Sequence, residues 1–358
     1  MAEQLIPGLP DEIARECLAR VPCNRFCNVR AVCRGWRAEL DSPDFYIFRK
    51  STGLSRSVVA FSQNERTSTA AKHPDTPPVF RLSLIDPISG AWERPPPVPG
   101  HPHGLPLFCR VAASGRSLVV IGGWDPATWS ATDAVHVYDL ASATWRAGAP
   151  MPGPLRSFFG YASDSRSTVY VAGGHDEHKN ALRSALAYDV AKDKWAPLPD
   201  MARERDECKG VFWRGEFHVI GGYGTEGQGR FVRSGESFCN ATWQWGPEEE
   251  DVLEVCTCPS TCGVGPDSNL YMSVGGHVVV REGAMWRRVA KLPREAEAVK
   301  CLVAYRRGLV VVACGGQRGP HSTHVLELVG PMRRCTWTRV DMPAGYAGHV
   351  SEGCCFEI

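Results

Sequence analysis

The chain repeats a short pattern in which an apolar, β-branched run leads into two adjacent glycines. The run Leu118–Ile121 precedes the first pair, and similar runs precede the later pairs. Such runs predict buried strands. A glycine pair after a strand predicts a point where backbones approach closely. The pairs begin at Gly122, Gly173, Gly221, Gly275 and Gly315, so the sequence has an internal repeat of about 50 residues.

A tryptophan recurs with the same period. It stands at Trp92, Trp145, Trp195, Trp245, Trp286 and Trp337. A run such as Val135–Asp139 comes shortly before Trp145, which predicts two further strands joined by a turn. Each repeat is then a four-stranded sheet whose tryptophan packs against the neighbouring sheet. Because one such sheet cannot bury both of its faces, we expect the sheets to stack in a ring of six blades.

The first repeat is incomplete unless the C-terminal segment contributes to it. Phe80–Pro97 supplies only the last half of a blade, and Ser57–Phe61 can supply its second strand. Gly353–Ile358 follows Trp337 much as an inner strand follows the tryptophan of an earlier repeat. We therefore predict a mainly β fold, a six-bladed β-propeller closed by the C-terminal strand, because closure removes exposed sheet edges.

Residues 5–48 do not follow the repeat and predict a small all-α unit. Leu9–Glu12 is typical of a helix start, with proline in the first turn and acids that complement the helix dipole. The apolar positions of Ile13–Val21 share one helical face, and Pro22 ends the helix. A second amphipathic segment runs over Val29–Leu40, and Ser42-Pro43 ends it. A unit of this size needs a neighbour or a partner to bury its apolar faces.

Composition and charge narrow the function classes. A formal net charge of +1 gives no reason to expect nucleic-acid or membrane binding. The start of the chain has no secretory pattern, so the 15 cysteines are expected to be reduced thiols. The spacing within Cys256–Cys262 and within His175–His178 does not match common metal sites. No metal, no cofactor and no catalytic residue is therefore expected.

Four short segments of the N-terminal unit resemble the F-box. They are Leu9–Glu12, Leu18–Pro22, Val32–Arg37 and Ser42–Phe45, in the order and spacing of that motif. The resemblance implies a helical F-box domain over 1–48 that binds the adaptor Skp1, called ASK in plants, and through it cullin 1. The implied adaptor contacts are Leu9, Pro10, Ile13, Leu18, Val32 and Trp36. The alternative reading is that these residues form only the core of the helical unit.

The remaining residues, 49–358, would form the target-binding part of the protein. The loop after each glycine pair and the loop after each tryptophan strand should emerge on the same rim. These loops mix arginine, acids and aromatic residues, which is the composition of an interaction surface. The candidate target-binding residues are Arg110, Trp124, Trp129, Arg156, His175, Asp176, Arg203, Arg205 and Tyr223. The alternative is that they are ordinary solvated loop residues.

The period of the repeat is that of the kelch family, and several rim segments look like the Kiss-Me-Deadly group of plant F-box/kelch-repeat proteins. These segments are Gly104–Arg110, Arg156–Gly160, Val171–Glu177, Asp200–Lys209 and His218–Tyr223. The resemblance implies a non-catalytic substrate receptor of a Skp1–cullin–F-box (SCF) ubiquitin ligase in the cytoplasm and nucleus. It implies phenylalanine ammonia-lyase or type-B response regulators as targets, and hence negative control of phenylpropanoid synthesis or of cytokinin signalling.

Two other classes of function remain open at this point. Some kelch propellers are secreted copper radical oxidases, which need a set of Tyr, His and Cys ligands. A kelch propeller can also be an interaction scaffold without a ligase role. The N-terminal helical motif and the absence of a secretory pattern favour the ligase receptor over both.

Overall fold

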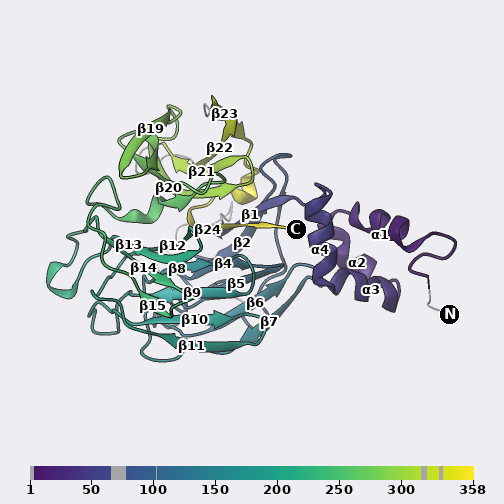
Figure 1. Ribbon diagram of the computed structural model, residues 1–358, viewed down its shortest axis with the longest axis horizontal. Coiled ribbons are helices and arrows are strands. Elements are labelled where there is room, and N and C mark those ends of the chain that lie inside the picture. Colours follow the sequence, from purple (N-terminus) through teal and green to yellow (C-terminus); the bar gives the residue numbers. More distant parts are fainter. Residues whose placement is uncertain (1–3, 66–77, 102, 316–320, 330–333) are drawn as a thin grey trace.

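The computed structural model describes residues 4–65, 78–101, 103–315, 321–329 and 334–358. In these residues, six four-stranded sheets surround a common axis, and four α-helices lie at one side of them (Figure 1). The predicted fold class, a six-bladed propeller after a small helical region, is confirmed.

Every blade is an antiparallel sheet whose strands are ordered from the axis outward. Blade 1 consists of β24 (Val350–Glu357), β1 (Ser57–Asn64), β2 (Phe80–Ile85) and β3 (Trp92–Glu93). Blade 2 consists of β4 (Arg110–Ser114), β5 (Ser117–Ile121), β6 (Val135–Asp139) and β7 (Thr144–Gly148), and blade 3 of β8 (Gly160–Ser163), β9 (Thr168–Ala172), β10 (Ala185–Asp189) and β11 (Lys194–Leu198). Blade 4 consists of β12 (Lys209–Trp213), β13 (Glu216–Ile220), β14 (Gly235–Cys239) and β15 (Gln244–Trp245), and blade 5 of β16 (Gly263–Val264), β17 (Leu270–Val274), β18 (His277–Glu282) and β19 (Met285–Lys291). Blade 6 consists of β20 (Ala298–Tyr305), β21 (Gly308–Cys314), β22 (His321–Val329) and β23 (Arg334–Val340).

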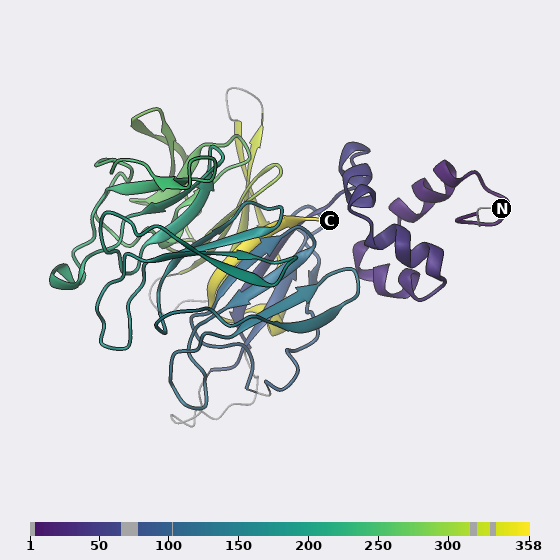
Figure 2. The ribbon, with the colours of Figure 1, turned by 60° about the horizontal axis from the view of Figure 1, so that its bottom comes forward.

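The C-terminal strand closes the ring, as predicted. β24 pairs antiparallel with β1, with Val59 opposite Cys355 and Ala60 opposite Cys354. Figure 2 shows this yellow strand among the blue strands of blade 1. The first and last strands of the propeller therefore lie in one sheet, and blade 1 is complete only when both are present.

The glycine pairs allow backbone positions that other residues resist. Gly173 and Gly174 have φ values of 67° and 80°. A Cβ atom on Gly174 would stand 2.3 Å from the carbonyl oxygen of Ser157 in the neighbouring loop. In blade 5 the pair Gly275-Gly276 instead forms the tight turn between β17 and β18, so this blade lacks the loop that follows the pair elsewhere.

Five of the six periodic tryptophans link each blade to the one before it. In each, the indole N–H donates to a carbonyl at or just after the end of the outer strand of the preceding blade. The acceptors of Trp92, Trp145, Trp195, Trp245 and Trp337 are the carbonyls of Asp341, Pro96, Ala149, Pro199 and Lys291, at 2.7–3.0 Å. Trp286 of blade 5 is the exception: its buried Nε1 has no partner in the described residues.

The helical region contains α1 (Asp11–Ala19), α2 (Phe26–Arg30), α3 (Arg34–Asp41) and α4 (Pro43–Ser51), with the short 3-10 helix η1 (Cys23–Arg25) between α1 and α2. The prediction of one amphipathic segment over Val29–Leu40 is wrong. The helix breaks after Arg30, and the Cys33 side chain accepts from the Trp36 N–H to start α3. α4 starts at the Ser42 N-cap and continues past residue 48. The described part of the propeller contains three further 3-10 helices: η2 (Thr225–Gly227), η3 (Pro259–Thr261) and η4 (Ala344–Tyr346).

A buried arginine holds the helices to the propeller. The guanidinium of Arg49 donates to the carbonyls of Ala19, Val21 and Leu54 and to the carbonyl of Ile358. On the neighbouring blade, Arg116 pairs with Asp41 at 3.3 Å and with Asp139 at 2.7 Å. Since Arg116 lies in the turn between β4 and β5, the helices contact the end of the ring where the first two strands of a blade are joined.

Candidate interaction surfaces

Two surfaces stand at opposite ends of the blades. The helices contact the turn before β5, whereas the loop after Gly122-Gly123 leaves the other end of the same strand. We call the exposed side of α1–α4 the helical face. We call the loops that follow the glycine pairs, together with those that precede the inner strands, the rim.

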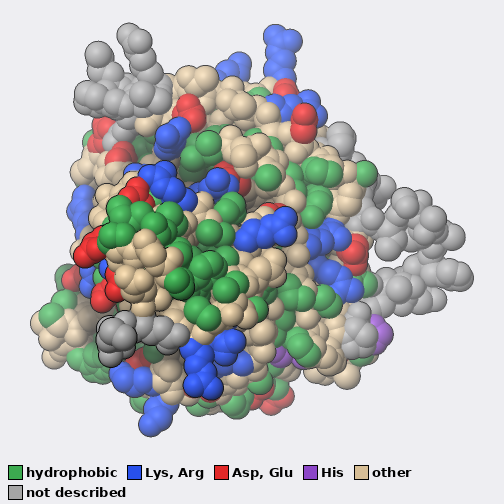
Figure 3. Space-filling model, turned by 90° about the vertical axis from the view of Figure 1, so that its right-hand side faces the viewer, with side chains coloured by type: hydrophobic (Ala, Val, Ile, Leu, Met, Phe, Trp, Pro, Cys, Tyr) green, Lys and Arg blue, Asp and Glu red, His purple; other side chains and the backbone are tan. Residues whose placement is uncertain are grey.

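The helical face exposes aliphatic side chains. Ile13 is 47% exposed, Val32 61% and Ile47 64%. Viewed from this end, hydrophobic side chains gather near the middle of the molecule with basic side chains beside them (Figure 3). Exposed aliphatic residues on a small helical unit are typical of a protein-binding surface. Ile47 was not among the predicted contacts, although its place in a helix that begins with Ser42-Pro43 could have indicated it.

The structure divides the predicted adaptor contacts into two groups. Ile13, Val32 and Pro10 are exposed and Leu9 is half-buried, so all four can reach a partner. Leu18 is buried in the core shared by the helices and blades 1 and 2. Trp36 is half-buried, and its indole N–H donates to the carbonyl of Leu5 at 2.7 Å. Leu18 therefore supports the helical face from within.

The rim is built by the same backbone bridge in three successive blades. The residue after each glycine pair is bridged to the loop before an inner strand, in the pairs Trp124–Leu107, His175–Ser157 and Tyr223–Asp206. The next residue of each inner loop is Phe108, Phe158 or Glu207, with φ values of 58°, 53° and 49°. Left-handed backbone is uncommon for such residues, and at all three positions it directly follows a bridged residue.

Aromatic rings form a continuous group over blades 2 and 3. Phe108 lies 5.2 Å from Phe158 and 5.9 Å from Trp124. Phe158 stacks on His175 at 5.5 Å. The Trp124 indole N–H donates to the Ser157 hydroxyl at 2.7 Å. We call Phe108, Trp124, Phe158 and His175 the aromatic arc. Its members prefer edge-on and offset contacts, and Phe108 is among the exposed large hydrophobic residues.

Polar contacts continue the arc toward blade 4. Nδ1 of His175 lies 2.9 Å from a carboxylate oxygen of Asp206. The hydroxyl of Tyr223, a mostly buried side chain, donates to Glu207 at 3.0 Å. Burial, together with Glu207 and Asp206, raises the pKa of this hydroxyl well above its ordinary value, so Tyr223 is a hydrogen-bond donor at neutral pH.

Arg156 and Arg205 do not lie on the surface of the rim. Both are almost completely buried. Arg156 donates to the carbonyls of Gly173 and Ser184, and Arg205 to those of Gly221 and Ser234. Each arginine donates a hydrogen bond to the carbonyl of the first glycine in a glycine pair. Arg205 also forms an ion pair with the buried Glu236. These two predicted target contacts instead hold the rim loops in place.

Arg110 lies in the interior and takes part in closing the ring. It pairs with Glu352 of β24, which also accepts from the Tyr161 hydroxyl at 3.1 Å and lies 3.7 Å from Lys209. These four residues come from the inner strands of blades 1 to 4. Burial alone would raise the pKa of Glu352, but Lys209, Arg110 and Tyr161 together lower it below the ordinary value. Local sequence patterns do not predict this pairing, because its members are far apart in the chain.

The remaining candidates lie at the surface of the rim. Trp129 is exposed, and Asp176 accepts main-chain hydrogen bonds from His178 and Asn180 of its own loop. Arg203 is exposed and pairs with Glu248 at 2.7 Å. A hollow of about 570 Å³ between blades 3 and 4 is lined by Arg183, Ala202, Arg203, Glu204, Arg205, Tyr223, Gly224 and Val232. The aromatic arc and this hollow together form a surface with an apolar side and a charged side, where Arg183, Arg203 and Arg205 are paired with carboxylates.

The described residues contain no cluster of three or more His, Cys, Asp or Glu side chains placed to hold a metal ion. In the same part of the chain, no helix combines the length and the apolar character needed to cross a membrane. All fifteen cysteines are free thiols.

Comparison with known proteins gave two family matches. The model of the F-box domain matches residues 6–48, and the model of the kelch motif matches residues 107–152 and 165–202. Among similar proteins, F-box/kelch-repeat protein At1g80440 of Arabidopsis thaliana is 43% identical over 99% of this chain and all of its own length. F-box/kelch-repeat protein At1g15670 of the same plant is 42% identical, again over 99% of this chain and its own full length. F-box/kelch-repeat protein SKIP20 is 36% identical over 67% of this chain and 65% of its own.

Proposed function

The chain belongs to the plant F-box/kelch-repeat family, and from this premise we propose that it is the substrate-recognition subunit of an SCF ubiquitin ligase. F-box domains bind Skp1 in SCF complexes and kelch propellers bind target proteins. Proteins that combine the two are generally SCF substrate receptors. In this chain, the helical face would bind the adaptor and, through it, cullin 1.

The observation that carries the proposal is the placement of two unlike surfaces at opposite ends of one closed ring. Exposed Ile13 and Val32 stand at the helical end, and the aromatic arc stands at the rim. Arg49 and Arg116 fix the helices to blades 1 and 2. A target held at the rim would thus keep a constant position relative to the ligase, and the receptor would act by proximity rather than by a chemical step of its own.

We propose that the rim is the target surface, with Trp129, Arg203 and the aromatic arc as contacts. Large aromatic side chains and arginine contribute most to binding in many protein interfaces. By the resemblance to the Kiss-Me-Deadly group, the targets would be phenylalanine ammonia-lyase or type-B response regulators. The protein would then restrain phenylpropanoid synthesis or cytokinin signalling, in the cytoplasm and nucleus.

The adaptor assignment is tested with exposed residues, so that folding is not at risk. The double variant Ile13→Asp/Val32→Asp places two charges on the helical face and is expected to weaken Skp1 capture at least tenfold, because burying unpaired charges in an apolar interface is costly. The control is Ile88→Asp, an equally exposed isoleucine in the propeller. Unchanged Skp1 capture by the double variant, measured with purified proteins, would contradict the assignment.

The target assignment needs a separate measurement. Purified phenylalanine ammonia-lyase and a type-B response regulator are each titrated against the full chain and against Phe158→Ala. Binding that is lost in this variant supports the rim as the target surface. Binding of neither protein, at concentrations where Skp1 is captured normally, would remove both targets and leave the adaptor assignment intact.

A further inference from the structure

The joint between blades 4 and 5 is built differently from the other five. It is the joint where the periodic tryptophan, Trp286, leaves its buried indole N–H without a partner in the described residues. Blade 5 also has the shortest inner strand, β16, of two residues. In the described residues, this joint therefore lacks the tryptophan hydrogen bond that links the outer strand to the preceding blade at the other five joints.

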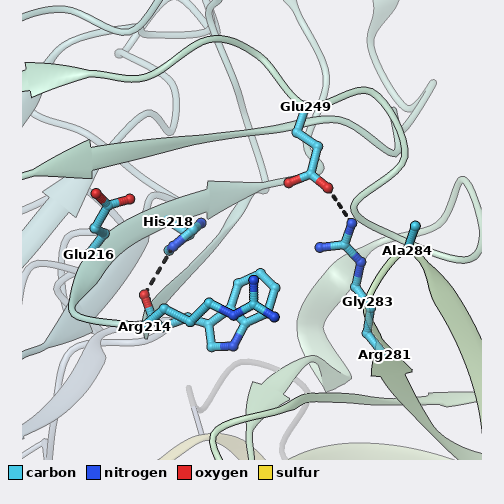
Figure 4. Close-up of a pocket in the computed structure, with 8 residues that line it drawn as sticks. Arg214, Glu216, His218, Glu249, Arg281, Gly283 and Ala284 are labelled. Atoms are coloured by element: carbon cyan, nitrogen blue, oxygen red, sulfur yellow. Dashed lines mark hydrogen bonds and ion pairs between the residues drawn. The ribbon is translucent and has the colours of Figure 1, made fainter.

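A crevice of about 360 Å³ opens at this joint. Trp213, Arg214, Glu216 and His218 line it from blade 4 and the segment after it contributes Glu249, while Arg281 lines it from blade 5 (Figure 4). Trp213 and Glu216 flank the turn between β12 and β13. In blade 2, the turn between the first two strands contacts the helices. The corresponding turn of blade 4 borders the crevice, so the crevice lies toward the helical end of the ring and away from the rim.

Two guanidinium groups lie on the ring of Trp213. Cζ of Arg214 is 4.4 Å from the ring centroid and Cζ of Arg281 is 5.6 Å from it. Arg214 is exposed, and so it can move to meet a ligand. Arg281 is buried, and its Nε has no hydrogen-bond partner among the described residues. Cations on an aromatic ring are partly stabilised, yet a buried guanidinium still needs acceptors.

The carboxylate that pairs with Arg281 comes from Glu249. The side chain of Arg281 is 5% exposed, whereas that of Glu249 is 53% exposed. The carboxylate of Glu249 can therefore return to water at little cost, but the guanidinium of Arg281 cannot. This asymmetry makes Glu249 an exchangeable partner. In Figure 4 the glutamate reaches into the crevice from above Arg281.

His218 adds an acceptor to the same crevice. Its Nε2 is 3.1 Å from the carbonyl oxygen of Trp213. A carbonyl can only accept, so Nε2 carries the hydrogen and Nδ1 of the neutral ring is the acceptor. Burial lowers the pKa of His218, with Glu216, the Trp213 carbonyl and Glu249 opposing that change and Arg214 adding to it. The ring is therefore neutral at pH 7 and can accept a hydrogen bond from a ligand.

We propose that this crevice binds an acidic segment of a protein partner. The partner's carboxylate replaces Glu249 on Arg281 and is met by Arg214, and a main-chain N–H of the partner donates to Nδ1 of His218. Glu249 is then the internal occupant of a site for carboxylates. The site goes beyond the proposed ligase function, since it uses neither the aromatic arc nor the exposed aliphatic residues of the helical face.

The chain itself supplies a probe. A synthetic peptide with blocked ends that copies residues 246–252, Gly-Pro-Glu-Glu-Glu-Asp-Val, presents the acidic sequence that contains Glu249. The control peptide carries glutamine and asparagine in place of the acids. Calorimetric titration of the full chain should give salt-sensitive binding of the acidic peptide only, because charge pairing is screened by salt.

Two variants of the protein make the test specific. Glu249→Gln removes the internal competitor and should tighten peptide binding about fivefold, while Arg214→Gln should weaken it about fivefold, as expected for one charge-assisted contact. The matched control is Arg166→Gln, an exposed arginine in the corresponding turn of blade 3, which should change nothing. No binding to the wild type or to Glu249→Gln, or equal weakening by Arg214→Gln and Arg166→Gln, would overturn the proposal.

Discussion

The helical face and the rim differ in how far their side chains are engaged by the chain itself. Ile13 and Val32 project from the helices with about half or more of their surface exposed. At the rim, Phe158 stacks on His175, His175 is bound to Asp206, and the loops beneath them rest on buried arginines. Each exposed side chain of the helical face therefore depends little on its neighbours, whereas the side chains of the rim hold one another in place. A substitution in the rim should disturb more of the surrounding residues than one in the helical face.

The variant Gly174→Ala gives the strongest test of this difference between the helical face and the rim. A left-handed backbone and a Cβ atom 2.3 Å from the Ser157 carbonyl should destabilise the protein by about 3 to 4 kcal/mol. Denaturant unfolding measures the loss. Since the Ser157–His175 bridge supports the aromatic arc, target binding should fall as well, while Skp1 capture by the folded fraction stays normal. Loss of Skp1 capture by that fraction would show that the two ends are not independent.

The second prediction concerns the carboxylate that joins the inner strands. Glu352→Gln should cost about 2 to 3 kcal/mol, because Arg110 and Lys209 lose their nearly buried counter-charge. The pKa of Glu352 is lower in the folded protein, so its contribution is present above the pKa of the unfolded chain, about 4.3. It is lost as the pH falls through the lower folded-state value.

Unfolding free energies measured from pH 7 downward test this sign. The wild type should lose stability below about pH 4 more steeply than Glu352→Gln, because the variant lacks this titrating group. Glu226→Gln, an exposed glutamate in a rim loop, is the control and should follow the wild type. A parallel loss in wild type and Glu352→Gln would show that the ring is closed without help from this charge.

A smaller effect compares two joints within the ring. Trp195→Phe removes an indole N–H that donates to the Ala149 carbonyl at 2.8 Å, so it should cost about 1 kcal/mol beyond the change in packing. Trp286→Phe removes an N–H that has no partner in the described residues, so its cost should be lower. Thermal unfolding of the two variants checks the order, and the reverse order would show that Trp286 is engaged.

The smallest expected change in stability comes from Phe108→Asn. Asparagine tolerates the left-handed φ of 58° at this position, and the exposed ring makes few buried contacts. The free energy of unfolding should therefore shift by less than about 1 kcal/mol. Target binding should nevertheless weaken, because the ring ends the aromatic arc. Unaltered target binding would place the contact elsewhere on the rim.

The ring was accessible from the sequence because its markers are periodic. The glycine pairs and tryptophans gave the six blades, and the missing strand of the first repeat pointed to the C-terminal segment. The break between α2 and α3 could not be predicted from the sequence. It depends on the thiol of Cys33, which accepts a hydrogen bond from the Trp36 N–H. Helical periodicity continues across such a break, so spacing alone could not reveal it.

The rim was predicted as a region but not residue by residue. Arg156 and Arg205 have the sequence context of exposed loop residues. Both are nevertheless buried, because their guanidinium groups donate hydrogen bonds to the carbonyls of Gly173 and Gly221. The positions of Phe108 and Phe158 depend on positive φ values. A phenylalanine in a sequence does not predict a positive φ. Arg110 meets Glu352 only after the ring has closed. Long-range partners of this kind are invisible to a local pattern.

The pairing of β24 with β1 sets an order of events during synthesis. The ribosome delivers the helices before the strands, and β24 is the last of the described strands to be made. Until then β1 presents one unpaired edge, open to chaperones or to unwanted association. A polypeptide that ends before residue 350 would still carry the F-box helices but would lack the strand that closes the propeller. If these helices bind the adaptor as proposed, such a fragment would occupy adaptor molecules and deliver nothing to them.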